Sequence, residues 1–162
     1  MKTMLVTNHL IAVLAALTLA GSVMAESQDE EAAKPERPSS DEPAFTLDAD
    51  DPALEWLPCP DFMPGDCRIA ILQGDPEEGD FDLLFRLQPG TTAPRHWHTS
   101  AERMVLLTGE LHLDFEGQDA LVMDPGTYAY GPPGRPHSAH CAEGDACLLF
   151  IAFEEHLDAI PY

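Results

Sequence analysis

Short strand-like segments separated by turns run through most of this chain, and they limit its possible folds more than any other feature. After residue 67 the apolar residues form short runs with no helical period longer than two turns. Glycine, proline and aspartate separate the runs at spacings of about 8–12 residues, which is typical of an all-β sandwich or barrel. We expect strands over Arg68–Gln73, Phe81–Leu87, Arg95–His98, Glu102–Leu107, Leu111–Phe115, Ala120–Met123, Tyr128–Tyr130, Arg135–His140 and Cys147–Phe153.

Two further segments precede the strands. A positive charge at Lys2 and an apolar run over Leu10–Ala20 predict a secretory signal peptide over residues 1–25, and that run is about half the ~20 residues that a membrane-spanning helix needs. Residues 26–44 are acidic and rich in serine and proline, so we expect a disordered linker. Residues 45–162 would then form one β domain of a protein exported to a periplasm or secreted.

Acidic side chains greatly outnumber basic ones. The chain has 29 Asp and Glu against 8 Lys and Arg, a formal net charge of −21. A protein this negative repels phosphate backbones and anionic lipid surfaces. We therefore expect neither nucleic acid nor, once the signal peptide is removed, a membrane among its partners.

The four cysteines predict disulfides, because an exported protein meets an oxidising compartment. Three pairings are possible, and local pairing is the simplest. Cys59 and Cys67 flank a turn-rich loop, while Cys141 and Cys147 flank what resembles a hairpin turn. Free, buried thiols are the alternative.

A cluster of metal-binding residue types lies between Gly90 and Gly109. His96 and His98 are two residues apart, and strand side chains alternate with period two, so both imidazoles can face one point. Glu102 can add a carboxylate from the neighbouring strand. The spacing predicts that these side chains hold one metal ion.

Two longer patterns include this cluster and reveal a family resemblance. Residues 90–109 read G-x5-H-x-H-x3-E-x6-G, and residues 126–141 read G-x5-P-x-G-x2-H-x3-C. The paired patterns resemble the two motifs of the cupin superfamily, except that Cys141 stands where the second motif usually ends in Asn. With Trp56 and the Gly74-Asp75-Pro76 turn, the chain is similar to small single-domain bacterial cupins, including the cupin half of the anti-sigma factor ChrR.

The resemblance implies a jelly-roll β-barrel with one divalent transition metal inside it. His96, His98, Glu102 and His137 would be the four ligands, and His137 follows a rigid turn rich in proline and glycine. Three imidazoles and one carboxylate leave one or two coordination positions open, as expected for Fe, Mn, Ni, Cu or Zn in a reactive site.

Strand parity predicts the surroundings of the ion. We expect Met104, Leu106 and alternate residues of Phe81–Leu87 and Cys147–Phe153 to form an apolar chamber. Tyr128 and Tyr130 are candidate catalytic groups at its mouth, with core packing as the equal alternative, and Arg95 is a further candidate there.

The remaining histidines and the C-terminal segment are expected outside the site. His112 should face away from the core, His140 has the opposite parity to His137, and we assign no site role to His156. Residues 156–162 would form an extended tail on the outside or at a subunit contact. An outward Trp97 and this tail are compatible with a homodimer.

The expected function is that of a metal-dependent enzyme acting on a small organic molecule, with a dioxygenase as the first hypothesis. A redox metal with open positions supports that reaction, while the same ion as a Lewis acid would support an isomerase, decarboxylase or lyase. A non-catalytic module that binds metal or senses a small ligand is the alternative of a different class.

Overall fold

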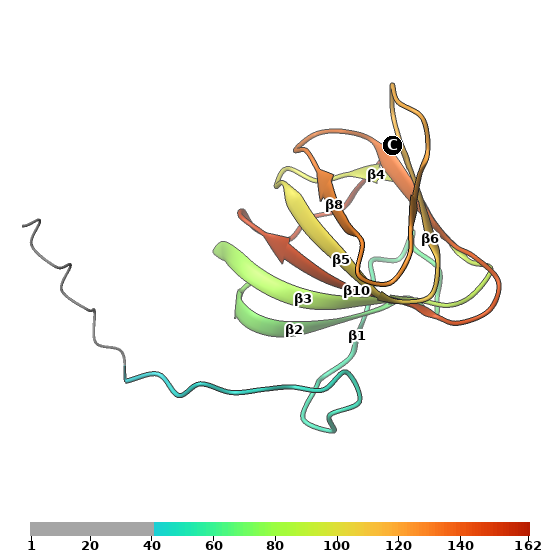
Figure 1. Ribbon diagram of the computed structural model, residues 1–162. Helices are drawn as coiled ribbons and strands as arrows, with labels where there is room; N and C mark the ends of the chain where they lie inside the picture. Colours follow the sequence, from blue (N-terminus) through green and yellow to red (C-terminus); the bar gives the residue numbers. More distant parts are fainter. Residues whose placement is uncertain (1–40) are drawn as a thin grey trace, which may run out of the picture. The chain divides into compact units, whose positions relative to one another are not determined.

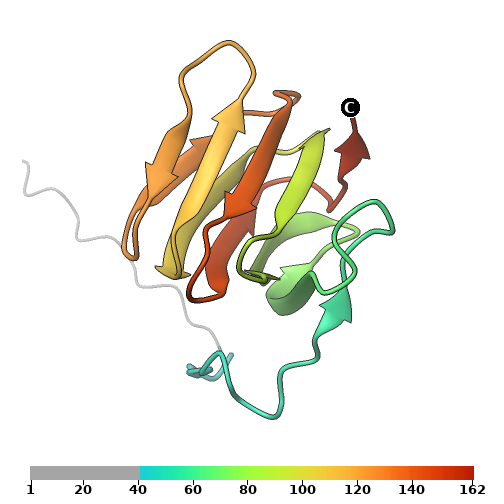
Figure 2. The ribbon, with the colours of Figure 1, turned by 90° about the vertical axis from the view of Figure 1, so that its right-hand side faces the viewer.

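The computed structural model describes residues 41–162, whose strands form two antiparallel sheets (Figure 1). The six-stranded sheet has the order β1-β2-β3-β10-β5-β8, and the five-stranded sheet, seen from outside in Figure 2, has the order β11-β4-β9-β6-β7. This arrangement confirms the predicted all-β jelly-roll class. The strands are β1 (Leu57–Pro58), β2 (Arg68–Asp75), β3 (Gly79–Leu87), β4 (Thr92–Trp97), β5 (Glu102–Thr108), β6 (Leu111–Phe115), β7 (Leu121–Met123), β8 (Tyr128–Gly131), β9 (His137–Cys141), β10 (Cys147–Phe153) and β11 (Ile160–Pro161).

All nine predicted strands are present, with boundaries that differ by no more than three residues. Period-two alternation explains the agreement, because β6 and β9 bury every second side chain. The structure adds two short strands, β1 and β11, which have only two residues each and therefore carry no periodic signal.

The main core lies between the inner faces of the two sheets. Phe81 and Leu83 of β3 face it from one sheet, and Leu113 and Phe115 of β6 face it from the other, all at most 2% exposed. The rings of Phe81 and Phe153 stack at 5.1 Å between centroids. This core makes the inner faces apolar, and the metal-binding residue types project into it.

A second, smaller cluster lies on the outer face of the six-stranded sheet. Ala70, Leu84 and Leu148 are buried there under Leu54 and Trp56, which precede β1. The guanidinium of Arg86 lies 4.1 Å from the centre of the Trp56 ring, within the range of a cation–π contact. Strand β10 is consequently apolar on both faces, which explains its unbroken run of apolar residues.

The predicted segments at the start of the chain lie largely outside the described residues. The signal peptide over residues 1–25 falls wholly outside, as does the linker over residues 26–44 apart from its last four residues, which are exposed. In the described part of the chain, no helix has the length and apolarity needed to cross a membrane.

Candidate metal centre

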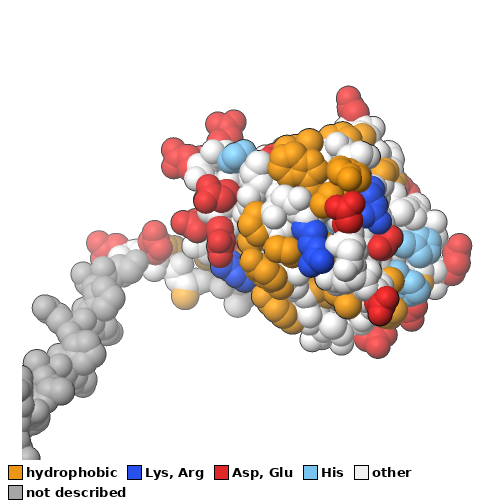
Figure 3. All heavy atoms as spheres, turned by 90° about the horizontal axis from the view of Figure 1, so that it is seen from above, with side chains coloured by type: hydrophobic (Ala, Val, Ile, Leu, Met, Phe, Trp, Pro, Cys, Tyr) orange, Lys and Arg blue, Asp and Glu red, His pale blue; other side chains and the backbone are white. Residues whose placement is uncertain are grey.

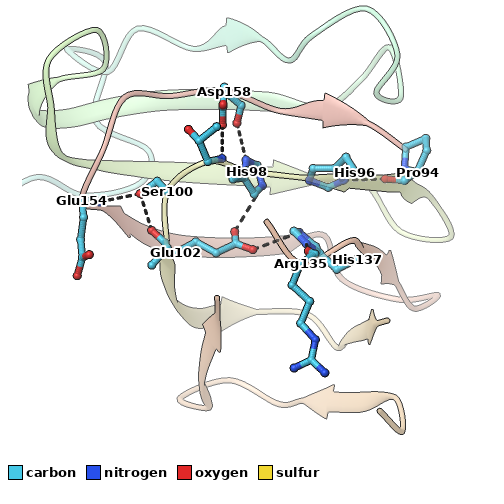
Figure 4. A network of polar contacts seen from close by, with 11 residues as sticks. Pro94, His96, His98, Ser100, Glu102, Arg135, His137, Glu154 and Asp158 are labelled. Carbon is cyan, nitrogen blue, oxygen red and sulfur yellow. Dashed lines mark hydrogen bonds and ion pairs between the residues drawn. The ribbon is translucent and has the colours of Figure 1, made fainter. Parts of the chain in front are cut away.

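Strand register brings residues from distant parts of the chain to one point inside the barrel. His96 near the end of β4 pairs directly with His137 at the start of β9. His98 follows β4, and Glu102 opens β5 at the facing sheet. Figure 4 shows the four side chains pointing toward one another.

The three histidines form a compact, buried group. One ring nitrogen from each of His96, His98 and His137 lies within 4.8 Å of the others. The three side chains and Glu102 are between 4% and 8% exposed. Buried imidazoles at this spacing are the arrangement expected when three ring nitrogens share one ion.

Main-chain carbonyl groups fix the orientation of all three rings. The Nδ1 atom of His96 lies 2.7 Å from the carbonyl oxygen of Pro94, and that of His137 lies 3.1 Å from the carbonyl oxygen of Arg135. The Nδ1 atom of His98 contacts the carbonyl oxygen of Asp158. Because a carbonyl can only accept, each Nδ1 carries the proton and each Nε2 keeps a free lone pair. All three rings are thus set as metal ligands through Nε2.

Glu102 supplies the observation that distinguishes a metal site from an ordinary buried polar cluster. Its Oε1 atom lies 3.1 Å from Nε2 of His137, and its Oε2 atom lies 3.8 Å from Nε2 of His98. These nitrogens are acceptors in the tautomers fixed by the carbonyls, and Oε1 has no hydrogen-bond partner among the described residues. Buried acceptors that face one another need a proton or a cation between them, and a metal ion held by the three rings and Glu102 would meet this need.

Burial sets the protonation of the site. It lowers the pKa of His96 to about 4, with a further lowering from His137 and His98, and it lowers the pKa of His137 to about 4. The same burial raises the pKa of the Glu102 carboxyl above its usual value. His96 and His137 are therefore neutral at physiological pH and could bind a metal without losing a proton.

Two small residues that the motif treats as spacers shape the position of Glu102. A Cβ atom at Gly131 would lie 2.5 Å from Oε1 of Glu102, so only glycine leaves room for the carboxylate. The Ser100 hydroxyl accepts hydrogen bonds from the amides of Glu154 and Glu155, both at 3.0 Å, and donates to the carbonyl of Ala101 at 2.8 Å. No spacing in the sequence indicates either role.

A cavity of about 390 Å³ surrounds the site. Its walls are apolar, as parity predicted for Met104 and for alternate residues of β3 and β10. Its rim includes the loop from Pro58 to Met63 and the C-terminal segment Leu157–Ala159. The volume lies at the small end of the range for small-molecule sites.

The polar groups predicted at the mouth of the chamber lie elsewhere. Tyr128 and Tyr130 are 57% and 51% exposed on the outer face of β8, while Ala129 between them faces inward. The register explains this placement, because the tyrosines pair with Val105 and Arg103, whose side chains alternate with the inward ones. Neither tyrosine lines the cavity, so their predicted position at its mouth is wrong.

Arg95 is also placed incorrectly by the prediction. It does not line the cavity, and its guanidinium pairs with Asp114 at 2.9 Å. His112 and His140 lie on the outer side of the five-stranded sheet, as expected, with ring centroids 6.0 Å apart. His156 is exposed, 3.7 Å from the carboxylate of Asp158.

The C-terminal segment belongs to the site, which corrects the expectation of an outer tail. Strand β11 pairs with β4 beside His96, and the residues just before β11 line the cavity. Asp158 contributes its carbonyl to His98, and its Oδ1 accepts a hydrogen bond from the Thr99 amide at 2.9 Å. The group that orients His98 is the main-chain carbonyl oxygen of Asp158, and no sequence pattern predicts a main-chain contact.

Both local disulfides form. Cys59 pairs with Cys67, closing the loop on the cavity rim, and Cys141 pairs with Cys147. The described residues contain no free cysteine. Two disulfides are compatible with a periplasmic or extracellular protein.

Comparison with protein families gives a match over most of the chain. A family model described as the ChrR Cupin-like domain matches residues 47–156. This chain belongs to that cupin family. The matched range includes all four residues of the candidate metal centre. A comparison with curated protein sequences found no match.

Solved structures support the same fold. The DMSP lyase DddQ from Ruegeria pomeroyi DSS-3 matches with a TM-score of 0.59 and 16% identity over 67% of the cupin and 60% of its own chain. An RmlC-like cupin from Ralstonia eutropha JMP134 matches with a TM-score of 0.55 and 23% identity, covering 70% and 69%. A predicted oxalate decarboxylase from Thermotoga maritima matches with a TM-score of 0.57 and 16% identity, covering 68% and 99%. The cupin thus spans about three fifths of the DMSP lyase, and identities this low establish the fold alone.

The cysteine in the second cupin motif has a structural role. Cys141 ends β9 with its side chain fully buried in the disulfide to Cys147. Its amide donates to the carbonyl of Thr91 at 3.0 Å, and its own carbonyl accepts from Gly90 at 2.9 Å. The two bonds hold the end of β9 opposite His137 against the start of the first motif, and the disulfide links this end to β10.

Proposed function

We propose that this cupin is an exported, metal-dependent enzyme that acts on a small organic molecule, with dioxygenation as the reaction class. One observation carries the proposal: three Nε2 lone pairs and an unpartnered carboxylate oxygen of Glu102 meet at the wall of an apolar chamber. A purely structural ion would be enclosed by protein, whereas this site opens onto space for a ligand.

The chain's own residues would prepare the centre for chemistry. A divalent iron, manganese, nickel or copper ion would supply Lewis acidity and a redox couple there. The carbonyls of Pro94, Arg135 and Asp158 hold the three rings in one orientation. Glu102 offsets one positive charge, and the apolar walls exclude water from the reacting groups.

The scarcity of acid–base groups favours dioxygenation over proton-transfer chemistry. Isomerases and lyases need a general base within hydrogen-bond reach of the substrate. Apart from the four proposed ligands, Asp158 is the one titratable side chain on the described wall, and its Oδ1 already accepts from Thr99. Oxidation by dioxygen at a redox metal depends less on a general base beside the substrate.

Two alternatives rest on their own observations. Asp158 could serve as the base of a lyase or decarboxylase, and the structurally similar proteins include a DMSP lyase and a predicted oxalate decarboxylase. The ChrR Cupin-like family description favours a non-catalytic module that binds metal or senses a small ligand.

Metal content and oxygen uptake discriminate among the three. Protein purified from its native compartment is analysed for metals, then stripped, reloaded with iron(II) and assayed with an oxygen electrode against catechols, thiols and β-diketones. We expect substrate-dependent oxygen uptake that His98→Ala abolishes. Product formation without oxygen uptake would favour the lyase, and tightly held zinc without any turnover would favour the binding module.

Export is a separate part of the proposal. The signal-peptide pattern over residues 1–25 and the two disulfides support it. We expect the mature protein in the exported fraction to begin at Glu26. A cytoplasmic, full-length protein with reduced cysteines would contradict export and leave the reaction class untouched.

A further inference from the structure

The chamber contains no positive charge, because every arginine of the described residues is engaged elsewhere. Residues 41–162 contain five arginines and no lysine, and none of the five lines the cavity. Two of them form ion pairs with acidic partners: Arg95 with Asp114 and Arg103 with Glu154. An anionic group in the chamber would therefore find no cation other than the ion itself.

The other three arginines are held by main-chain or aromatic groups. Arg68 donates to the carbonyls of Gly65 and Cys67 at 2.9 and 2.6 Å. Arg135 donates through Nε to the carbonyl of Glu116 at 3.0 Å, and Arg86 lies over Trp56. These contacts hold each guanidinium outside the chamber, where it cannot bind a ligand in the cavity.

Hydrogen-bonding groups are equally scarce inside the chamber. Among the described lining residues the polar side chains are the three histidines, Glu102 and Asp158, and none is a serine, threonine, tyrosine, asparagine or glutamine. The remaining wall is formed by side chains such as Leu83, Phe85, Met104, Leu149 and Ile151. A polar group placed against these walls would lose water without gaining a partner, which is unfavourable.

The charge of the surroundings acts in the same direction. The two acidic side chains on the wall, Glu102 and Asp158, would repel an anion. Figure 3 shows acidic side chains in red around much of one face of the protein, with only a few basic ones in blue. The whole chain has a formal net charge of −21. Approach of a multiply charged anion is therefore disfavoured before it reaches the ion.

We propose that the chamber selects a small molecule with a single oxygen- or sulfur-donor head, which binds the ion, and an uncharged, apolar body. Dicarboxylates and phosphorylated compounds are disfavoured, because the described wall has no cationic side chain for a second anionic group. Sugars are disfavoured because, beyond the four proposed ligands, Asp158 is the one polar side chain on that wall for their several hydroxyls. This inference rests on the proposed function, because it requires a metal ion bound by His96, His98, Glu102 and His137. It identifies the substrate class of that same site.

Two ligands that share a metal-binding head test the inference without turnover. Zinc-loaded full-length protein is titrated by calorimetry with benzohydroxamate and with 4-carboxybenzohydroxamate, which adds one carboxylate at the far end. We expect the uncharged compound to bind about tenfold more tightly or better, because the added carboxylate would be buried unpaired. Equal or tighter binding of the carboxylated compound would overturn the inference.

A matched pair of variants adds a positive charge inside and outside the chamber. Ile69 lines the cavity and is half-buried, so Ile69→Lys places an ammonium group on the wall. Leu72 lies on the same strand but packs on the outer cluster, so Leu72→Lys is the control. We expect Ile69→Lys to reduce the preference for the uncharged compound and Leu72→Lys to retain it. The wild-type titration decides the question if either variant fails to fold.

The outcomes separate this inference from the proposed function. Failure to bind zinc would overturn both, because no centre would exist. Zinc retention with no binding of either hydroxamate would overturn the inference. Substrate-dependent oxygen uptake by the iron-loaded protein, without the preference for an uncharged body, would uphold the proposed function and overturn the inference. The preference without any turnover would uphold the ligand class and count against the enzyme.

Discussion

The five-stranded sheet carries histidines on both faces, and the inner and outer histidines differ in burial and in hydrogen-bond partners. On the inner face, His96 and His137 are about 5% exposed and their Nδ1 atoms face carbonyl oxygens. On the outer face, His140 contacts the Thr92 hydroxyl and His112 contacts the Glu110 carboxylate. His137 and His140 lie on the same strand, three residues apart.

The comparison indicates that orientation and burial, more than the presence of histidine, decide which histidines could hold a metal ion. Each inner ring has one nitrogen fixed by a main-chain acceptor and the other aimed at a shared point. In the outer pair, Nε2 of His112 contacts the Glu110 carboxylate and Nδ1 of His140 contacts the Thr92 hydroxyl. Separate substitution of inner and outer histidines therefore tests whether the inner face binds metal and the outer face does not.

The largest expected effect comes from replacing, in separate variants, the inner and the outer histidine of β9 by alanine. His137→Ala removes one of four ligands, and we expect zinc affinity to fall by more than about a hundredfold, beyond the loss typical of an outer-shell partner. His140→Ala removes a ring on the other face and should keep wild-type affinity. Competition titration with a chromophoric chelator measures both. Similar losses in the two variants would mean that the faces do not differ as described.

Glu102→Gln should separate metal affinity from stability. We expect a loss of about ten- to a hundredfold in zinc affinity. The metal-free variant should gain about 1 kcal/mol in its free energy of unfolding, because the new amide can donate to Nε2 of His137, 3.1 Å from Oε1 in the wild type. Urea unfolding with and without chelator checks this, and lower stability of the metal-free variant would contradict the unpaired carboxylate.

Gly131→Ala tests the room that Glu102 requires. The added methyl group would lie 2.5 Å from Oε1, so the carboxylate must move away from the ion, and we expect a loss of about tenfold in zinc affinity. Gly65→Ala is the control, because no atom lies within 4 Å of the added Cβ. An unchanged affinity in Gly131→Ala would show that Glu102 is not positioned by this contact.

A further expected effect is a change in the pH dependence of stability. The pKa of His137 is lowered to about 4 in the folded protein, so between pH 6.5 and 4 the unfolded chain binds a proton that the folded state does not. His137 therefore reduces the stability of metal-free protein as the pH falls through that window. The raised pKa of Glu102 acts in the opposite direction, because the folded state retains a proton that the unfolded chain releases.

Removing the histidine isolates its contribution. In His137→Gln, we expect the decline in unfolding free energy from pH 6.5 to 4.5 to be shallower by up to about 1.4 kcal/mol per pH unit. Urea unfolding of metal-free protein at several pH values gives the slopes. A slope identical to that of the wild type would show that His137 titrates alike in both states.

The strand pattern and the juxtaposition of His96 and His98 could be predicted from the sequence because both have a local signal. Alternation identified the nine longer strands, and the spacing of His96 and His98 placed two rings on one face. His137 came from resemblance to cupins, since about forty residues separate it from His96 and His98 and only register brings them together.

What could not be predicted depends on main-chain atoms and on register across the barrel. The carbonyl that orients His98 comes from Asp158, sixty residues away, and any residue type supplies a carbonyl. Tyr128 and Tyr130 were assigned to the mouth because parity alone does not say which set of alternate residues on β8 faces inward. Pairing with β5 decides this, and Ala129 takes the inner position opposite Met104.

X-ray absorption spectroscopy at the edge of the bound metal tests the central claim most directly. The claim is that His96, His98, Glu102 and His137 share one ion through nitrogen and oxygen atoms. It predicts stoichiometric metal whose first shell contains three imidazole nitrogens, visible by multiple scattering, and at least one oxygen, with one imidazole fewer in any metal retained by His137→Ala. Sulfur in the first shell, fewer than three imidazoles, or an unchanged spectrum in that variant would contradict it.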